Sequence, residues 1–430
     1  MNAPESFLEK LEAKTVKIQL NGRSVEAKDN ETILKVARRE GFDIPTLCYK
    51  DDYREDGNCR ACVVEVKGER VLAPSCCRNV AEGMEINTNN ERAMLSQKMV
   101  LEMLLADVPE TGHKWVSDDK NHPHGELSLW AKKLGVEPRS SLKELRREVV
   151  AQDASHPAMF VDLSSCIQCD RCVRACREEQ ANDVIGVFGR GAETKIVFDT
   201  DVSMGKSTCV ACGECVQACP TGALMPKSLI GSQVVDKEVD SVCPFCGVGC
   251  LLTYKVKDER IVAVDGRDGP ANHKRLCVKG RFGFDYAHHP ERLKKPLIRK
   301  KGVSKKKIDD YSKLEIKDFF REATWKEVID LFSIILMNIK NKNGPSSVCG
   351  FGSAKGSNEE AYLFQKLIRT AFKTNNVDHC TRLCHASSVA ALMECVGSGA
   401  VSAPFTAVKD SDCMIIIGAR PTTNHPVAAT

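Results

Sequence analysis

The sequence lacks the features that mark exported, membrane-spanning or nucleic-acid-binding proteins. No apolar run reaches the roughly 18 residues that a membrane-spanning helix needs. The N-terminus, Met1 to Leu20, contains no apolar run between a positive charge and a small-residue cleavage site. The 62 Lys and Arg residues nearly balance the 58 Asp and Glu, and the net charge of +4 gives no support for a basic nucleic-acid-binding surface. These absences predict a cytoplasmic protein with no membrane insertion and no nucleic-acid partner.

Cysteine, by contrast, is abundant. The chain has 22 cysteines among 430 residues, which is too many for an ordinary cytosolic enzyme. The chain is also too long to be a small scaffold held together by disulfides. In a reducing cytosol, grouped cysteines are more often metal ligands than disulfides. Most of the cysteines fall into four blocks, and these blocks define the domain map.

The first block follows a strand, turn, strand and helix. Asn21-Gly22 is a strong hairpin signal between predicted strands at 16–20 and 23–27, and a helix is predicted over 32–39. The cysteines that follow are Cys48, Cys59, Cys62 and Cys76. This order is typical of a β-grasp ferredoxin, in which four thiolates converge on a [2Fe-2S] cluster. The alternative is a zinc site built on Cys59 and Cys62.

The second and third blocks form an internal repeat. Each has the C-x2-C-x2-C-x3-C spacing of bacterial two-cluster ferredoxins, in which the fourth cysteine of each run binds the other cluster. One [4Fe-4S] cluster is therefore predicted on Cys166, Cys169, Cys172 and Cys219, and a second on Cys209, Cys212, Cys215 and Cys176. Arg177 stands where proline is usual. A zinc knuckle would need histidines or only four cysteines per unit.

The fourth block predicts a third [4Fe-4S] cluster. Its cysteines are Cys243, Cys246, Cys250 and Cys277. Three of them come from one loop, and the last is distant in the sequence. The segment 252–264 predicts two strands about Lys257-Asp258-Glu259, and such a hairpin brings Cys277 back beside the loop.

Around the fourth block the sequence resembles the first domain of molybdenum or tungsten bis-pterin oxidoreductases. The resemblance rests on segments 243–250 (CPFCGVGC), 276–283 (LCVKGRFG) and 288–293 (HHPERL). In that superfamily a lysine two residues past the last cluster cysteine bridges the cluster and a pterin, which implies this role for Lys279. A cationic side chain can donate to both anionic groups. On composition alone, Lys279 would be a surface lysine.

A later segment, 376–390 (NVDHCTRLCHASSVA), resembles the active-site segment of formate dehydrogenases. The resemblance implies that Cys384 ligates the molybdenum or tungsten and that His385 assists with the proton. The alternative for His385 is a merely packed histidine. A Gly/Ser loop precedes a helix predicted from Glu359 onward, and a buried strand predicted over 412–418 precedes a further loop. The resemblance implies that these loops contact a bis-molybdopterin guanine dinucleotide through Gly352, Ser353, Asn358, Glu359, Gly418, Asn424 and Pro426.

The predicted fold class is α+β and α/β with several domains. A β-grasp [2Fe-2S] domain is expected over 14–95, a helical spacer over 96–150 and a two-[4Fe-4S] ferredoxin-like domain over 151–232. A [4Fe-4S] domain of the molybdopterin oxidoreductase type follows over 237–293, and an incomplete molybdopterin-binding α/β domain over 294–430. This order resembles the catalytic subunit of cytoplasmic multi-subunit formate dehydrogenases.

The resemblance implies that formate is oxidised to carbon dioxide, or the reverse. Electrons would pass through the iron–sulfur clusters to partner subunits that bind flavin and NAD. The alternative is a non-catalytic electron-transfer subunit, similar to the large iron–sulfur subunit of NADH-quinone oxidoreductase. Retention of Lys279 with Cys384 and His385 argues against that alternative. Molybdenum and tungsten use the same ligands, so the metal stays open.

Two departures from the family pattern matter. Many relatives carry a further cubane on one histidine and three cysteines after the first ferredoxin domain. Between Leu104 and Gly135 this chain has no cysteine and keeps only His113, His122 and His124, so we predict that this cluster is absent. Relatives also continue beyond the position of Thr430, so we expect a fragment of a longer subunit in preference to a truncated electron carrier. No role is predicted for Cys77, Cys349, Cys380, Cys395 and Cys413.

Overall fold

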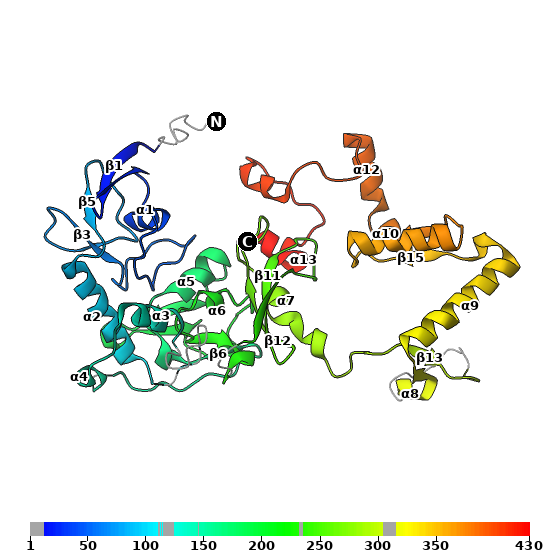
Figure 1. Ribbon diagram of the computed structural model, residues 1–430, viewed down its shortest axis with the longest axis horizontal. Helices are drawn as coiled ribbons and strands as arrows, with labels where there is room; N and C mark the ends of the chain where they lie inside the picture. Colours follow the sequence, from blue (N-terminus) through cyan, green and yellow to red (C-terminus); the bar gives the residue numbers. More distant parts are fainter. Residues whose placement is uncertain are drawn as a thin grey trace. The chain divides into compact units, whose positions relative to one another are not determined.

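The computed structural model describes residues 13–110, 112, 114, 124–144, 146–231, 235–303 and 315–430. The chain divides into two compact units, one holding residues 1–285 and 417–430 and the other residues 286–416. Each unit is described by itself (Figure 1). His113 and His122 lie outside the described residues. In the part that is described, no helix combines the length and apolar character needed to cross a membrane.

The first unit begins with a five-stranded mixed sheet in the order β2-β1-β5-β3-β4. Strand β1 pairs antiparallel with β2 and parallel with β5. The predicted hairpin is confirmed, because Asn21 and Gly22 turn at φ values of 49° and 79°, the left-handed geometry of a two-residue hairpin turn. The strands are β1 Thr15–Leu20, β2 Arg23–Lys28, β3 Val63–Val66, β4 Ala73–Pro74 and β5 Glu85–Asn87.

Helix α1 (Ile33–Arg39) is the helix predicted after this hairpin. It begins at Thr32, whose hydroxyl accepts a hydrogen bond from the backbone N–H of Lys35 at 3.4 Å. The helix buries Ile33, Leu34, Val36 and Ala37 in the same core as strands β1 and β2. Cys62 and Cys76 belong to this core, so two predicted ligands are fixed by the packing of the sheet.

Helices follow the sheet in the segment predicted as a spacer. They are α2 (Glu91–Asp107), α3 (Gly125–Leu134) and α4 (Ser140–Lys143). Leu101 of α2 and Leu127 of α3 are fully buried. They share an apolar core with Cys48 and with Cys169 of the second cysteine block. The helices therefore cover the junction between the first and second candidate sites.

The repeat of cysteine runs forms a small α+β region. Its strands pair antiparallel as β6 (Met159–Val161) with β9 (Leu224–Pro226) and β7 (Ile185–Phe188) with β8 (Lys195–Phe198). Each run ends in a short helix, α5 (Arg171–Arg174) or α6 (Glu214–Ala218). The loops before these helices adopt the left-handed backbone conformation at equivalent positions, which are Gln168 and Asp170 in the first loop and Ala211 and Gly213 in the second.

A three-stranded antiparallel sheet, β10-β11-β12, follows. Strands β11 (Leu251–Lys257) and β12 (Arg260–Gly266) confirm the predicted hairpin, and β10 (Lys237–Val242) was not predicted. Helix α7 (Val278–Phe282) begins directly after Cys277. The C-terminal segment of this unit forms α13 (Pro421–Asn424) and α14 (Pro426–Ala429), so the loop predicted there is wrong. Each of these helices begins at a proline, a residue preorganised for the first helical turn.

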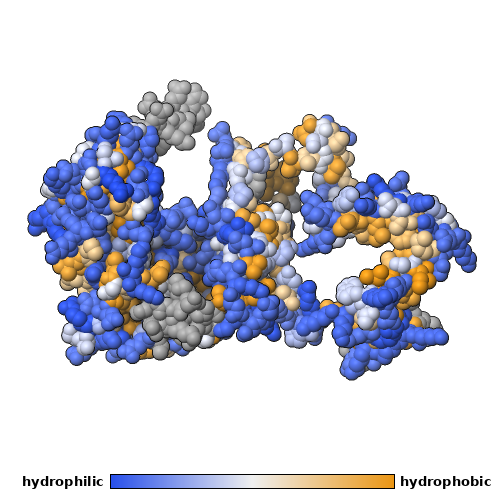
Figure 2. Space-filling view, in the orientation of Figure 1, coloured by the Kyte–Doolittle hydropathy of each residue, from blue (hydrophilic) through white to orange (hydrophobic). Residues whose placement is uncertain are grey.

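The described part of the second unit contains two small sheets and several helices, among them α9 (Trp325–Asn343), the longest described helix of the chain. Strand β13 (Leu297–Arg299) pairs antiparallel with β14 (Phe320–Glu322), and β15 (Gly350–Gly352) pairs parallel with β16 (Val377–His379). The helices are α8 (Ile316–Phe319), α9 (Trp325–Asn343), α10 (Asn358–Lys366), α11 (Thr381–Cys384) and α12 (Ala386–Val396). Helix α9 buries no residue, and Figure 2 shows its apolar surface.

The buried strand predicted over 412–418 is wrong. The segment pairs with no described strand, and its apolar residues are exposed, Ile415 by 79% and Ile417 by 85%. An apolar run becomes a buried strand only where a neighbouring strand supplies hydrogen-bond partners and covered faces. The described chain supplies neither at this position.

Candidate metal centres and cofactor site

The first candidate site gathers Cys48, Cys59, Cys62 and Cys76. The backbone N–H of Cys48 donates to the sulfur of Cys59 at 3.4 Å, and that of Cys59 donates to the sulfur of Cys48 at 3.4 Å. Thiol hydrogen bonds from Cys59 and Cys76 lower the pKa of Cys48 to about 2. A thiol hydrogen bond from Cys76 lowers the pKa of Cys62 to about 7. Three of the four residues are only 1% exposed, so the sulfurs form one buried group.

The next two sites exchange their fourth cysteines. Burial raises the pKa of Cys172 well above its ordinary value, and the neighbouring sulfurs of Cys166, Cys169 and Cys219 raise it further. Burial likewise raises the pKa of Cys215, together with the sulfurs of Cys212, Cys209 and Cys176. The structure therefore brings Cys219 to the first run and Cys176 to the second.

The repeat also directs backbone N–H groups at its sulfurs. The N–H of Gln168 donates to the sulfur of Cys166 at 3.4 Å, and at the equivalent position Ala211 donates to Cys209 at 3.3 Å. Such bonds stabilise negative charge on a ligating sulfur. The four cysteines of the first predicted [4Fe-4S] set, Cys166, Cys169, Cys172 and Cys219, line a cavity together with apolar side chains, among them Leu163, Ile167 and Ile196.

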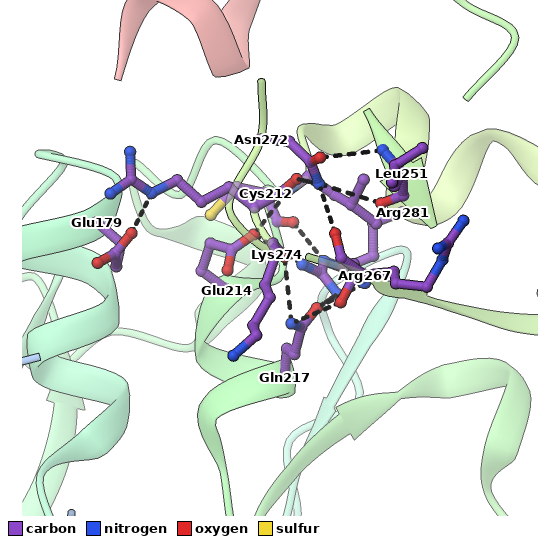
Figure 3. A network of polar contacts seen from close by, with 12 residues as sticks. Glu179, Cys212, Glu214, Gln217, Leu251, Arg267, Asn272, Lys274 and Arg281 are labelled. Atoms are coloured by element: carbon purple, nitrogen blue, oxygen red, sulfur yellow. Dashed lines mark hydrogen bonds and ion pairs between the residues drawn. The ribbon is translucent and has the colours of Figure 1, made fainter. Parts of the chain in front are cut away.

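The fourth site is assembled by the β11–β12 hairpin. Burial raises the pKa of Cys250 to about 12, and the sulfurs of Cys243, Cys246 and Cys277 add to this shift. Asn272 ties the distant cysteine to the loop. Its side chain accepts from the N–H of Leu251 at 3.0 Å and donates to the carbonyls of Leu251 and Arg275 at 3.1 and 3.0 Å (Figure 3).

These four sets fit iron–sulfur clusters. In the second, third and fourth sets, burial and the neighbouring sulfurs make ionisation of Cys172, Cys215 and Cys250 unfavourable, and a bound metal centre would reverse that preference. The sets supply four thiols each, the number that [2Fe-2S] and [4Fe-4S] clusters use. Among the described residues, no group of three or more His, Cys, Asp or Glu side chains is placed to hold a single metal ion.

A buried arginine that sequence reasoning missed joins the third and fourth sites. Arg281 is 1% exposed. Its guanidinium donates to the carbonyl of Cys212 at 2.8 Å and to the side-chain oxygens of Glu214 and Gln217, both at 2.7 Å (Figure 3). Glu214 also accepts from the N–H of Leu276, beside Cys277, at 2.8 Å. The only signal in the sequence was the position of Arg281 two residues after Lys279.

Gly213 provides a test of this close packing. A Cβ atom at Gly213 would lie 2.1 Å from Cδ of Arg281, whereas a Cβ at Gly231 would meet nothing within 4 Å. Both residues have a φ of +74°, so alanine at either position costs about 1–2 kcal/mol for left-handed backbone. Only Gly213→Ala adds overpacking, about 1–3 kcal/mol. We expect urea unfolding to show a larger loss for Gly213→Ala than for Gly231→Ala, and equal losses would contradict this packing.

In the second unit, the predicted Gly/Ser loop lies at a cavity. Gly352 and Ser353 line it with Lys355, Arg369 and His379. Asn358 and Glu359 open helix α10 but do not line this cavity. The start of α10 is closed by its own capping box, in which Glu360 N–H donates to the Ser357 hydroxyl at 3.3 Å and Ser357 N–H donates to the Glu360 carboxylate at 2.6 Å.

The remaining predicted residues are placed as follows. Helix α11 ends at Cys384, His385 stands between α11 and α12, and both side chains are exposed. Lys279 is an exposed residue of α7 in the first unit. The other predicted pterin contacts, Gly418, Asn424 and Pro426, also belong to the first unit. The cysteines without a predicted role, Cys77, Cys349, Cys380, Cys395 and Cys413, are all exposed.

Family models match the chain segment by segment. Residues 13–91 match a 2Fe-2S iron-sulfur cluster binding domain, and residues 165–223 match a 4Fe-4S dicluster domain. Residues 236–289 match the molybdopterin oxidoreductase Fe4S4 domain, and residues 292–430 match the molybdopterin oxidoreductase family. The chain is therefore a mixed α/β multidomain protein with the domain series of an iron–sulfur molybdopterin oxidoreductase.

Curated relatives align with nearly the whole of this chain. "Putative formate dehydrogenase YrhE" of Bacillus subtilis is 31% identical over 98% of this chain and 45% of its own length. A subunit of the NADH-quinone oxidoreductase of Rhizobium meliloti is 32% identical over 96% of this chain and 45% of its own length. A crystal structure of a NAD+-reducing [NiFe]-hydrogenase aligns with 52% of this chain and 92% of the hydrogenase chain, at 25% identity and a TM-score of 0.44. The chain spans less than half the length of these curated relatives.

Proposed function

We propose that the chain supplies the iron–sulfur centres and a molybdopterin-binding region of a molybdenum or tungsten formate dehydrogenase. The observation that carries the proposal is the convergence of four buried four-cysteine sets in a chain whose remainder matches the molybdopterin oxidoreductase family. The sets would hold one [2Fe-2S] and three [4Fe-4S] clusters. The relationship to a protein named as a formate dehydrogenase supports the substrate.

The residues have separate tasks in this reaction. Formate oxidation yields carbon dioxide, one proton and two electrons. A pterin-bound metal supplies the two-electron step, and iron–sulfur clusters take electrons singly. Cys384 would ligate the metal through its sulfur, and His385 would take the proton at its imidazole ring. Lys279 would donate to both the fourth cluster's surroundings and the pterin.

The electrons would leave through partner subunits that bind flavin and NAD. The burial of most of the cysteines in the four sets supports electron transfer through these sites, because a site shielded from water needs less solvent reorganisation when its charge changes. The second candidate function is a non-catalytic electron-transfer subunit, which the identity to the NADH-quinone oxidoreductase relative favours. Cys384, His385 and Lys279 favour the catalytic function, because electron transfer alone requires none of them.

Metal analysis of the purified chain tests the iron–sulfur assignment. We expect about 14 iron atoms per chain with a matching amount of acid-labile sulfide, because one [2Fe-2S] and three [4Fe-4S] clusters require that number. Substitution of Cys176 by serine should lower the iron content by up to about 4 atoms, whereas substitution of the exposed Cys413 should leave it unchanged. Stoichiometric zinc in place of iron would overturn the assignment.

A further inference from the structure

The junction between the first two candidate sites is built around a second buried arginine. Arg174 is 3% exposed and belongs to helix α5, between Cys172 and Cys176. Its guanidinium donates to the carbonyl of Cys48 at 2.6 Å and to the carbonyl of Cys169 at 3.2 Å. It also donates to the carbonyl of Arg54 at 2.5 Å and pairs with the carboxylate of Asp56 at 3.2 Å. One side chain thus holds the backbones of ligands that belong to two different sites.

Two neighbouring contacts support the same junction. The amide of Asn58, next to Cys59, donates to the carbonyl of Gln168, next to Cys169, at 2.8 Å. Arg171 donates to the carbonyl of Leu47, next to Cys48, at 3.1 Å and forms a two-pronged ion pair with Glu126 at 2.7 and 3.0 Å. Asn58 and Arg171 each lie next to a predicted ligand in the sequence. Their hydrogen bonds therefore hold the ligand loops of the first site directly against the first cysteine run of the repeat.

The second cysteine run contacts the fourth candidate site through the positions that correspond to Arg171 and Arg174 in the first run. Arg171 and Arg174 in the first run correspond to Glu214 and Gln217 in the second, one residue before and two residues after the third cysteine of each run. Glu214 and Gln217 both accept from Arg281, in the segment after Cys277. The two positions therefore dock the first candidate site on one side and the fourth on the other.

We propose that Arg174 is a positioning residue that fixes the separation between the [2Fe-2S] centre and the first [4Fe-4S] centre. The proposal rests on the iron–sulfur assignment above. In the transfer step, one electron leaves the reduced [4Fe-4S] centre and enters the oxidised [2Fe-2S] centre, and no bond is made or broken. A planar fork of five donors can hold several carbonyls at fixed angles, which a lysine ammonium cannot do.

The test uses Arg174→Lys and Arg174→Met in the full chain with its iron–sulfur centres loaded. The readout is the spin-lattice relaxation rate of the reduced [2Fe-2S] signal, which a neighbouring reduced [4Fe-4S] centre accelerates at short distance. In both variants we expect the enhancement of this relaxation rate to be several-fold smaller than in the wild type, while the iron content stays at the wild-type level. Gln217→Met is the matched control, because it alters the equivalent position toward the other neighbour, and we expect it to leave the acceleration unchanged.

The outcomes separate the two proposals. A wild-type chain without a [2Fe-2S] signal would overturn the iron–sulfur assignment itself. Wild-type relaxation in fully loaded Arg174→Lys would overturn the positioning role alone. If Arg174→Met loses iron or does not fold, the lysine variant, which keeps the positive charge opposite Asp56, still decides the matter. Equal loss of acceleration in Gln217→Met would show a general loosening of the region and would also overturn a specific role for Arg174.

Discussion

Replacement of Cys384 by alanine is expected to abolish formate-dependent dye reduction by the holoenzyme. The thiolate is the protein's predicted ligand to the pterin-bound metal, and no other side chain in the turn formed by Thr381–Cys384 can replace a soft sulfur donor. Iron content should stay at the wild-type level, because none of the four cluster sets uses Cys384. The measurement combines dye-reduction assays with iron and molybdenum or tungsten analysis of the same preparation.

The matched control for this experiment is Cys395→Ala. Cys395 is an exposed cysteine on the neighbouring helix α12, and we expect its loss to leave dye reduction unchanged. His385→Asn should retain metal but lose about 10²–10⁴-fold in rate, the usual contribution of a proton-transferring side chain. Formate-dependent activity in Cys384→Ala would contradict the catalytic assignment and favour the electron-transfer function.

Arg281→Met is expected to lower the free energy of unfolding of the first unit by about 3–5 kcal/mol. The substitution leaves the carboxylate of Glu214, only 4% exposed, without its charged partner. It also removes the donors to the carbonyl of Cys212 and the amide oxygen of Gln217. The loss should appear as a lower urea concentration at which the visible absorbance of the iron–sulfur centres disappears.

An exposed ion pair in the same unit calibrates this effect. Arg177 pairs with Asp183 at 2.8 Å, with both side chains more than half exposed, and Arg177→Met should cost less than about 1 kcal/mol. Combining Arg281→Met with Glu214→Leu should recover part of the loss, because no unpaired charge then stays buried. If Arg281→Met lowers the free energy of unfolding no more than Arg177→Met does, the buried Arg281–Glu214 pair does not stabilise the contact between the third and fourth sites.

The local signals in the sequence were the reliable ones. Asn21-Gly22 specifies a tight turn by its own backbone preferences. The second hairpin was predictable from the strand pattern on either side of Lys257-Asp258-Glu259. Strand β10 was missed because most of its residues are exposed and half of them are charged, and pairing with the neighbouring strand β11 decides its conformation. For the apolar run Met414 to Ile417 the error is the opposite one, because a strand was predicted and the structure has none. Strand formation there depends on neighbouring strands, which the hydropathy of the run does not indicate.

In the candidate sites, too, features set by local sequence were predictable, and features set by distant partners were not. Cysteine spacing is a local property, and it predicted which sulfurs the structure gathers into four sets. The burial of Arg174, Arg281 and Glu214 could not be predicted, because charged residues are assigned to the surface until their partners are known. The partners, such as Cys48 for Arg174 or Leu276 for Glu214, lie far away in the sequence.

The exchange of Cys176 and Cys219 has a consequence for biogenesis. During synthesis, the first run supplies only three of the four sulfurs of the first [4Fe-4S] set, because Cys219 belongs to the second run. The set stays incomplete until the second run has left the ribosome and packed against the first. A cubane delivered before that moment would find an open coordination position. Under the proposed assignment, loading of the two sites would be coupled to folding of the whole repeat, and a chain cut between the two runs would lose both centres at once.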